Sequence, residues 1–201
     1  EYGYESVVFF VGTGRDGMLS QDFQLSIFRT PNLAYTQSGY ACYQPRMMSS
    51  QMVLGALYPE LDFAGGLEGG YDDPEYQVPE LMVLWGKMPL ASNPDGFFGH
   101  AVIDLMKRGA KLVTIDPRVN WLATRSVVQL RLRNGTDAAL AMAMCNILIK
   151  EDLYDHDFIE RWCYGFDEFA ERVAYMTPEK AAEICEVPVD DIYRVARMYA
   201  A

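Results

Sequence analysis

The sequence predicts an α/β protein: a Rossmann-like, three-layer αβα domain with a mostly parallel sheet, followed by a small helical C-terminal appendage. Short apolar runs rich in β-branched and aromatic residues recur along residues 1–151, and segments with helical spacing separate them. Residues 152–201 show helical spacing alone. Strands that alternate with helices form βαβ units, and such units build a parallel sheet covered by helices on both faces.

Four apolar runs are expected to form the strands. Each is followed by turn residues and has the length of a buried strand; they are residues 6–11, 81–85, 111–115 and 127–132. The helices expected between and after them cover residues 21–29, 46–57, 96–108 and 136–151. The stretch 65–79 is rich in Gly, Asp and Pro and lacks periodicity, which predicts a long surface loop.

The helical appendage carries local signals of its own. Asp155 and the pair Thr177-Pro178 are typical of helix starts. An apolar stripe on the last helix is expected to face the core, and it contains Ile192, Val195, Ala196 and Tyr199. We therefore expect an α/β domain of residues 1–151 and a helical extension of the same domain over residues 152–201.

The composition argues against several classes of function. The 17 Lys and Arg stand against 28 Asp and Glu, a net charge of −11, so a nucleic acid is not an expected partner. The longest apolar stretch, residues 138–149, is too short to span a membrane. The two His cannot build a multi-histidine metal site, and the four Cys contain no C-x-x-C pair and leave the compartment open.

A glycine-rich loop follows the first expected strand. Residues 12–17 match G-x-G-x-x-G, a pattern that can hold a pyrophosphate at a helix N-terminus. A nicotinamide dinucleotide also needs a carboxylate about 20 residues later to bind its ribose, and residues 24–59 contain no acidic residue. A turn in which Gly12 and Gly14 let the chain leave a buried strand is at least an equal alternative.

The second βαβ unit fits nucleotide binding better. Gly86 begins the loop 86–95 and permits close approach of the backbone to a ligand, while Ser92 and the following helix N-terminus offer donors to phosphate. Asp116 ends the next strand and can accept a hydrogen bond from a ribose hydroxyl. The alternative is that Asp116-Pro117-Arg118 is a strand exit with a proline stop and a solvated arginine.

A carboxylate also follows the fourth expected strand. Asn134-Gly135-Thr136-Asp137 precedes and opens a helix, so Thr136 or Asp137 is expected to cap it. Asp137 would lie at the same sheet edge as Asp116. At that edge its carboxylate could accept hydrogen bonds from the N1 and N2 donors of a guanine, a pairing that only a carboxylate makes in bidentate form.

In this order and spacing, these residues resemble the molybdopterin oxidoreductases of the dimethyl sulfoxide reductase type. The resemblance covers nearly the whole chain and rests on four runs: W-G-x-x-P-x-x-S-x-P at 85–94, G-A-K-L-V-T-I-D-P-R at 109–118, N-G-T-D-A-A-L at 134–140 and E-D-L-Y-D-x-D-F-I at 151–159. Met88 departs from the pattern, because the family usually has Asn there, and the change removes an amide able to bond the cofactor. Residues 43–45 and 92–96 look more like the acetylene hydratase and hydroxyarene transhydroxylase branch than like nitrate reductases.

The resemblance implies two molybdopterin guanine dinucleotides that chelate molybdenum or tungsten, with the α/β domain holding the guanosine end of one of them. The implied contacts lie in the loops that follow the expected strands. They are Gly12, Gly14, Arg15, Trp85, Gly86, Lys87, Met88, Pro89, Ser92, Thr114, Asp116, Pro117, Arg118, Gly135, Thr136 and Asp137, with Ser38 in the segment that carries the metal ligand.

The family also supplies one protein ligand to the metal, and the resemblance places Cys42 at that position, in the segment 38–45. A soft thiolate suits Mo(IV) or W(IV), and the N-terminus of the helix 46–57 would favour its deprotonation. A lone cysteine is otherwise expected to be a buried apolar residue. That expectation applies to the remaining three, Cys145, Cys163 and Cys185.

We therefore expect the central domain of a molybdenum or tungsten enzyme for two-electron redox or for oxygen-atom or hydroxyl transfer. No catalytic acid or base is assigned, and His100 is expected to be a polar helix residue without a catalytic role. The resemblance implies that a [4Fe-4S]-binding N-terminal segment and a C-terminal β-rich domain lie outside this sequence, so the chain is not expected to be active alone. Its expected partners are those domains, an electron-transfer subunit and a small-molecule substrate.

Two alternatives stay open at this point. The first is a nicotinamide-binding Rossmann domain that uses residues 12–17 and is indifferent to Cys42. The second is a non-catalytic structural or partner-binding relative of the family, whose complete chain would carry no metal.

Overall fold

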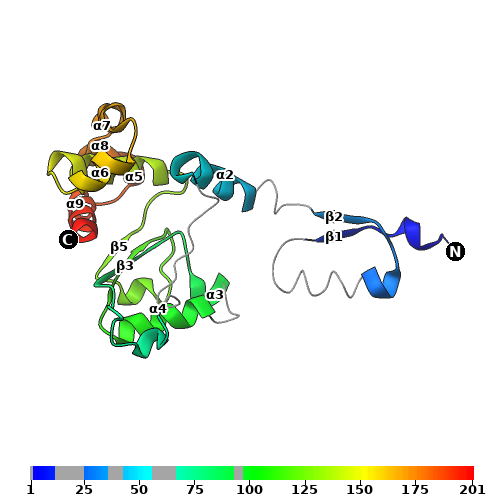
Figure 1. Ribbon diagram of the computed structural model, residues 1–201. Coiled ribbons are helices and arrows are strands. Elements are labelled where there is room, and N and C mark those ends of the chain that lie inside the picture. The colour runs from blue at the N-terminus through cyan, green and yellow to red at the C-terminus, as the bar shows by residue number, and fades with distance from the viewer. Residues whose placement is uncertain (1, 12–24, 36–42, 56–66, 93–96) are drawn as a thin grey trace. The chain divides into compact units, whose positions relative to one another are not determined.

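The computed structural model describes residues 2–11, 25–35, 43–55, 67–92 and 97–201, and its strands form parallel sheets accompanied by helices (Figure 1). The chain divides into two compact units, residues 1–66 and 67–201. The α/β class with parallel strands is therefore confirmed. Five predicted site residues lie outside the described residues: Gly12, Gly14, Arg15, Ser38 and Cys42.

The first unit contains a two-stranded parallel sheet. Strand β1 (Phe9–Val11) pairs with β2 (Leu33–Tyr35), with Phe9 opposite Leu33. The short 3-10 helix η1 (Tyr4–Ser6) precedes β1. Side chains join the segments that lead into the two strands, because Thr30 Oγ1 donates to the Val7 carbonyl at 2.7 Å and Asn32 Nδ2 donates to the Glu5 carbonyl at 2.7 Å.

The elements of this unit agree in part with the predictions. The strand expected at 6–11 is confirmed over Phe9–Val11, and residues 25–28 of the expected helix 21–29 are helical. Helix α2 (Tyr43–Leu54) begins before the predicted residue 46 because Pro45 is tolerated in a first turn, where its missing N–H is not needed. Strand β2 was not predicted, since its three residues are too few to show a period.

The second unit contains a three-stranded parallel sheet in the order β3-β4-β5. Strands β3 (Leu81–Trp85) and β4 (Lys111–Ile115) have the predicted bounds, and β5 (Val128–Leu130) is the centre of the run predicted at 127–132. Trp85 lies opposite Ile115, which lies opposite Leu130. The carboxyl ends of all three strands therefore meet at one edge of the sheet.

Helices accompany both faces of this sheet, with α5, α8 and α9 on one face and α4 on the other. The helices of the unit are α3 (Pro89–Ser92), α4 (Phe97–Lys107), α5 (Asp137–Lys150), α6 (His156–Trp162), α7 (Phe166–Ala174), α8 (Pro178–Cys185) and α9 (Val189–Ala200), with 3-10 turns η3 (Gly70–Asp72) and η4 (Ala123–Arg125). The predicted helices 96–108 and 136–151 are confirmed as α4 and α5. The predicted loop 86–95 contains α3, a helical turn too short to leave a periodic signal.

Alternate residues of the strands belong to two apolar layers, one on each face of the sheet. Val113, Ile115, Val128 and Leu130 pack in one cluster with buried residues of α5, α8 and α9. Met82, Leu84 and Leu112 alternate with them and face the other side, where α4 contributes the buried Ala101, Val102 and Leu105 (Figure 1). This arrangement is the predicted three-layer order.

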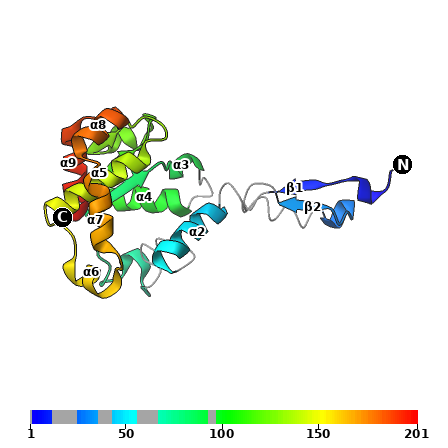
Figure 2. The ribbon, with the colours of Figure 1, turned by 90° about the horizontal axis from the view of Figure 1, so that it is seen from above.

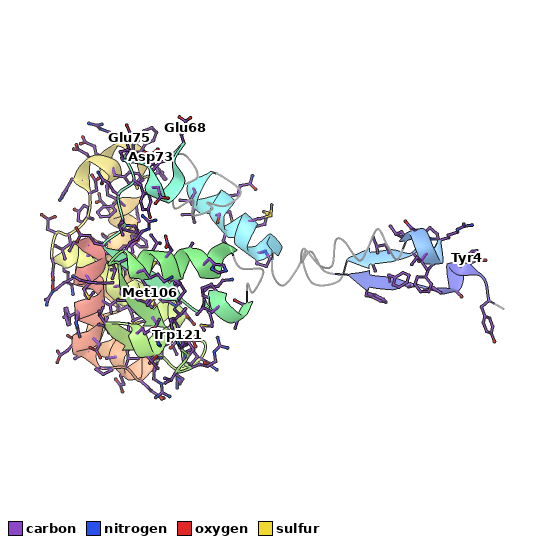
Figure 3. The ribbon with its side chains drawn as sticks, turned by 90° about the horizontal axis from the view of Figure 1, so that it is seen from below. Tyr4, Glu68, Asp73, Glu75, Met106 and Trp121 are labelled. Carbon is purple, nitrogen blue, oxygen red and sulfur yellow. The ribbon has the colours of Figure 1, made fainter. Side chains whose placement is uncertain are left out.

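The Asp73 carboxylate braces the loop before β3 from within. Asp73 accepts hydrogen bonds from the backbone N–H of Gly69 at 3.0 Å and of Glu75 at 2.9 Å, and these bonds lower its pKa. Figure 3 shows Glu68, Asp73 and Glu75 gathered in this part of the chain. Over residues 67–79 the prediction of a loop is confirmed, with η3 as its regular element.

The helical extension shares its core with the sheet. Asp155 and Thr177 accept hydrogen bonds from the N–H groups of Phe158 and Lys180, so both predicted helix starts are confirmed. Figure 2 shows α8 and α9 beside α5, and buried residues of all three contribute to the cluster under the sheet. Within the described part of the chain, no helix is both long and apolar enough to cross a membrane.

The stripe predicted on the last helix needs one correction. Ile192, Val195 and Ala196 are fully buried, but the Tyr199 side chain is 64% exposed. The prediction for Tyr199 was wrong because Met198, and not Tyr199, continues the packed face in the last turn of α9.

Candidate functional site

A hydrogen bond joins two of the predicted site residues across the carboxyl edge of the sheet. Trp85 is the last residue of β3 and Asp137 the first of α5, 52 positions apart. The Trp85 indole Nε1 donates to Asp137 Oδ1 at 2.7 Å. The indole ring packs against the core cluster, whereas Asp137 is exposed. The Asp137 carboxylate is therefore exposed at the surface, and the Trp85 ring that donates to it packs against the core.

The loop after β3 is shaped by Gly86. Its φ of +60° is a conformation that favours glycine, and a Cβ there would meet no atom of the described residues within 4 Å. Its N–H donates to the Ile115 carbonyl at 2.8 Å, which ties the start of the loop to the end of β4. The open space above Gly86 leaves room for another molecule to approach the backbone.

The next residues of this loop form the short helix α3. Pro89 is buried at its start, and the Met88 carbonyl accepts from the backbone N–H of Ser92 and from its hydroxyl, both at 2.9 Å. Lys87 is exposed beside Gly86. Ser92 thus already uses its hydroxyl proton within the turn, so a ligand could use its oxygen as an acceptor.

Asp116 and Arg118 form a bound pair at the end of β4. The Asp116 side chain is 3% exposed and that of Arg118 is 69% exposed. Arg118 donates to Asp116 through its backbone N–H at 2.8 Å, Nε at 3.2 Å and Nη2 at 3.2 Å, using both carboxylate oxygens. These side-chain hydrogen bonds lower the pKa of Asp116 and raise that of Arg118. The group that this strand end presents to solvent is therefore the guanidinium, with Pro117 exposed beside it.

Two polar residues that the sequence analysis did not single out support this strand end. Gln129 in β5 donates to the backbone carbonyls of Asp116 at 3.4 Å and Arg118 at 2.9 Å. Ser126 lies 3.1 Å from the hydroxyl of the buried Thr114. Thr114 is thus engaged inside the fold. A polar residue within a run predicted to be a buried strand is the signal that could have identified Gln129.

The start of α5 differs from the expected cap. The Thr136 hydroxyl donates to the Arg133 carbonyl at 2.6 Å, and neither Thr136 nor Asp137 makes a side-chain cap. The predicted cap was wrong because the Thr136 hydroxyl bonds to the preceding turn and the Asp137 carboxylate bonds to Trp85. Gly135 has φ +82°, and a Cβ there would meet nothing within 4 Å in the part of the chain that the structure describes.

Positive charge gathers at this edge of an acidic chain. Arg131 and Arg133 follow β5 directly and are exposed, as is Arg118 after β4. Arg133 also lies 3.8 Å from Glu186. Guanidinium groups at the ends of adjacent parallel strands favour a phosphate-bearing ligand over a cationic one.

The cysteines that the structure describes have different environments. Cys185 is fully buried, as predicted, and Cys145 is partly buried, which raises the pKa of its thiol. Cys163 is exposed, so its assignment to the core was wrong; it follows the end of α6 instead of lying inside a packed helix. Among the described residues, no cluster of three or more His, Cys, Asp or Glu could hold a metal.

A separate hollow lies along one face of α9. Its volume is about 600 Å³, and it is lined by Asp190, Tyr193, Arg194, Arg197, Met198 and Ala201. None of these residues belongs to the predicted site. The hydrogen bonds and open glycines described above, and not this hollow, identify the candidate site.

Comparisons with known proteins identify sequence relatives of this chain. No family model matches the chain. The chain is 45% identical over 95 residues to acetylene hydratase of Syntrophotalea acetylenica, covering 47% of this chain and 13% of that protein. It is 31% identical over 203 residues to the thiosulfate reductase molybdopterin-containing subunit PhsA of Salmonella typhimurium, covering 100% of this chain and 24% of that protein.

Structural comparison agrees with the sequence relatives. The solved structure of acetylene hydratase from Pelobacter acetylenicus matches 98% of this chain with a TM-score of 0.67 and 29% identity. The match covers 25% of that chain. The present chain thus spans about a quarter or less of the length of the relatives it matches.

Proposed function

Because this chain belongs to the molybdopterin oxidoreductases of the dimethyl sulfoxide reductase type, we propose that residues 67–201 bind the guanosine end of a molybdopterin guanine dinucleotide. The Trp85–Asp137 hydrogen bond carries this proposal. It brings together two of the runs on which the family resemblance rests and presents a carboxylate at the edge of a parallel sheet where nucleotides bind in open α/β folds.

The residues at this edge fit a guanine nucleotide. A carboxylate has about four lone-pair positions, and the described residues engage Asp137 through Oδ1 alone. Both oxygens therefore keep room for the N1 and N2 donors of guanine. Gly86 and Gly135 leave open space beside the backbone, and the Arg118 guanidinium supplies positive charge for ribose or pyrophosphate oxygens. In this proposal Asp116 mainly holds Arg118, since both of its oxygens are already bonded.

The remaining predicted contacts complete the proposal. The guanosine would be lined by Lys87, Met88, Pro89, Ser92 and the Gly135–Thr136 backbone. The neighbouring strand exit would be shaped by Thr114 and Pro117. Within residues 1–66, the cofactor contacts would be Gly12, Gly14, Arg15 and Ser38. Cys42 would be the protein ligand to the metal. When bound, the molybdenum or tungsten centre would supply two-electron redox or oxygen-atom or hydroxyl transfer. The described residues bind and orient the cofactor.

The activity of the whole protein extends beyond this chain. The relatives are several times longer, and we include in the proposal a [4Fe-4S] cluster, the other domains that enclose the cofactor, an electron-transfer subunit and a small-molecule substrate. In this proposal the chain provides part of the cofactor-binding site, and the other domains contact the reacting groups of the substrate.

Elemental analysis of the purified parent protein, with GMP released by acid hydrolysis, tests the proposal. The protein should contain two GMP for each molybdenum or tungsten. Asp137→Asn should lower the retained GMP from about two to about one per protein molecule, because this chain holds the guanosine end of one dinucleotide and an amide offers one acceptor oxygen and directs its NH₂ at the guanine donors. The control Asp157→Asn changes an exposed carboxylate on α6 and should have no effect. Protein free of metal and GMP, or full GMP in Asp137→Asn, would contradict the proposal.

A further inference from the structure

Among the residues that the structure describes, one side-chain donor binds the Asp137 carboxylate. Asp137 is exposed, and no side-chain cap forms at the start of α5, so the turn itself does not direct this side chain. Among the described residues, Trp85 Nε1 is its hydrogen-bond partner, at 2.7 Å. We propose that Trp85 is a positioning residue that sets the selectivity of this site for guanine by fixing the plane of the Asp137 carboxylate. The inference rests on the proposed function and concerns how that site reads the base.

The donor is well suited to this task because it is rigid. The indole ring of Trp85 packs against the core cluster at the end of β3, and the ring has one N–H in a fixed direction. A hydrogen bond to an ionised acceptor is stronger than one between neutral groups. A residue whose conformation is fixed by packing can therefore hold a more mobile residue that contacts the ligand.

The plane of the carboxylate matters for guanine more than for other bases. Guanine offers N1–H and N2–H side by side, and both reach the carboxylate only when its two oxygens lie in the plane of the base. Hypoxanthine offers N1–H alone, and a carboxylate that rotates can still meet a single donor. Loss of the indole N–H should therefore weaken guanine binding and spare hypoxanthine binding.

Isothermal titration calorimetry on the parent protein without its bound cofactor, with GDP and IDP as probes, measures this difference. Trp85→Phe keeps an aromatic ring and removes the N–H. It should lower GDP affinity about tenfold and leave IDP affinity within about twofold. Trp121→Phe is the matched control, since Trp121 is a half-exposed tryptophan whose ring lies under Arg125 (Figure 3), and it should change neither affinity.

The ratio of the two affinities separates positioning from a structural role. A variant that folds less well loses GDP and IDP binding together, so its GDP/IDP ratio stays at the wild-type value. An unchanged ratio in Trp85→Phe, combined with a collapsed ratio in Asp137→Asn, would overturn the inference and keep the proposed function. Wild-type protein that binds no GDP, or binds GDP and IDP equally, would overturn both.

Discussion

At the scale of single residues, two carboxylates that look alike in the sequence differ in what they can still bind. Asp116 is buried, and both of its oxygens accept hydrogen bonds from Arg118. Asp137 is exposed, and one of its oxygens accepts a hydrogen bond from Trp85. The first therefore acts as a support for an exposed cation, and the second remains available as an acceptor. This difference follows from partners far away in the chain for Asp137 and from the local turn for Asp116.

The Asp116–Arg118 pair predicts a specific loss of stability in acid. Because hydrogen bonds from Arg118 hold the pKa of Asp116 below its ordinary value, the folded state binds fewer protons than the unfolded state. The stabilisation is fully present above the unfolded pKa of about 3.9 and is lost as the pH falls from there through the folded pKa. Urea unfolding at a series of pH values should show this acid loss reduced in Asp116→Asn.

The same variant should be less stable than the wild type near neutral pH by about 2 kcal/mol, since a buried charge-assisted pair is broken. Arg118→Met keeps the carboxyl and the backbone donor but removes the side-chain donors, so the folded pKa of Asp116 should rise and the acid loss should shrink. If wild type, Asp116→Asn and Arg118→Met share one pH profile, the pair does not contribute to stability.

At the scale of elements, α5 connects the site to the helical extension. Its first residue meets Trp85, and farther along the helix Asn146, 2% exposed, reaches the end of α7. Asn146 Nδ2 donates to the backbone carbonyls of Val173 at 3.0 Å, Ala174 at 3.1 Å and Met176 at 3.2 Å. The last carbonyls of a helix have no partner in the helix itself, so one buried amide satisfies the end of α7.

Replacing this amide should destabilise the second unit. Asn146→Leu has similar volume but removes the amide donor from the Ala174 and Met176 carbonyls, whereas the Val173 carbonyl keeps the Met176 N–H, and the expected cost is about 2 kcal/mol. Urea unfolding followed by circular dichroism measures the change. Asn134→Ala, at an exposed position in the turn before α5, should change stability by less than about 0.5 kcal/mol. Equal stability of the two variants would show that the end of α7 does not need Asn146.

At the scale of the whole molecule, residues 67–201 enclose one core that the sheet and the C-terminal helices build together. Ile115 and Leu130 from the sheet lie in the same cluster as Cys185, Ile192 and Val195 from α8 and α9. A boundary at residue 151 therefore does not separate two hydrophobic cores. The helical extension completes the layer on one face of the sheet.

Truncation tests this shared core. The piece 67–201 should unfold in a single cooperative transition, because its buried residues find their partners within it. The piece 67–151 lacks α8 and α9 and should show no cooperative transition, since one face of its sheet would be uncovered. Denaturant unfolding of both, monitored by circular dichroism and tryptophan fluorescence, gives the comparison. A cooperative 67–151 would place the core within the sheet, α4 and α5 alone.

Local patterns in the sequence were sufficient for most of the second unit. Strands β3 and β4 were predicted with their observed bounds, and α4, α5 and the starts of α6 and α8 followed from spacing and capping residues. Strand β2 and helix α3 were not predicted because three or four residues do not repeat a period often enough to show it, whereas the equally short β1 and β5 lie within longer apolar runs. Tyr199 and Cys163 were misplaced since burial at the end of a helix depends on what packs there.

The sequence by itself determined the fold class and the order of the runs at the carboxyl edge, because residue type and spacing are properties of the chain, and those runs carried the family resemblance. The tertiary structure decided which of those residues meet. It joined Trp85 to Asp137 across 52 positions, directed the Thr136 hydroxyl away from the helix it precedes, and buried Asp116 beneath Arg118. Pairing between distant residues depends on sheet register and core packing, and these are properties of the folded chain as a whole.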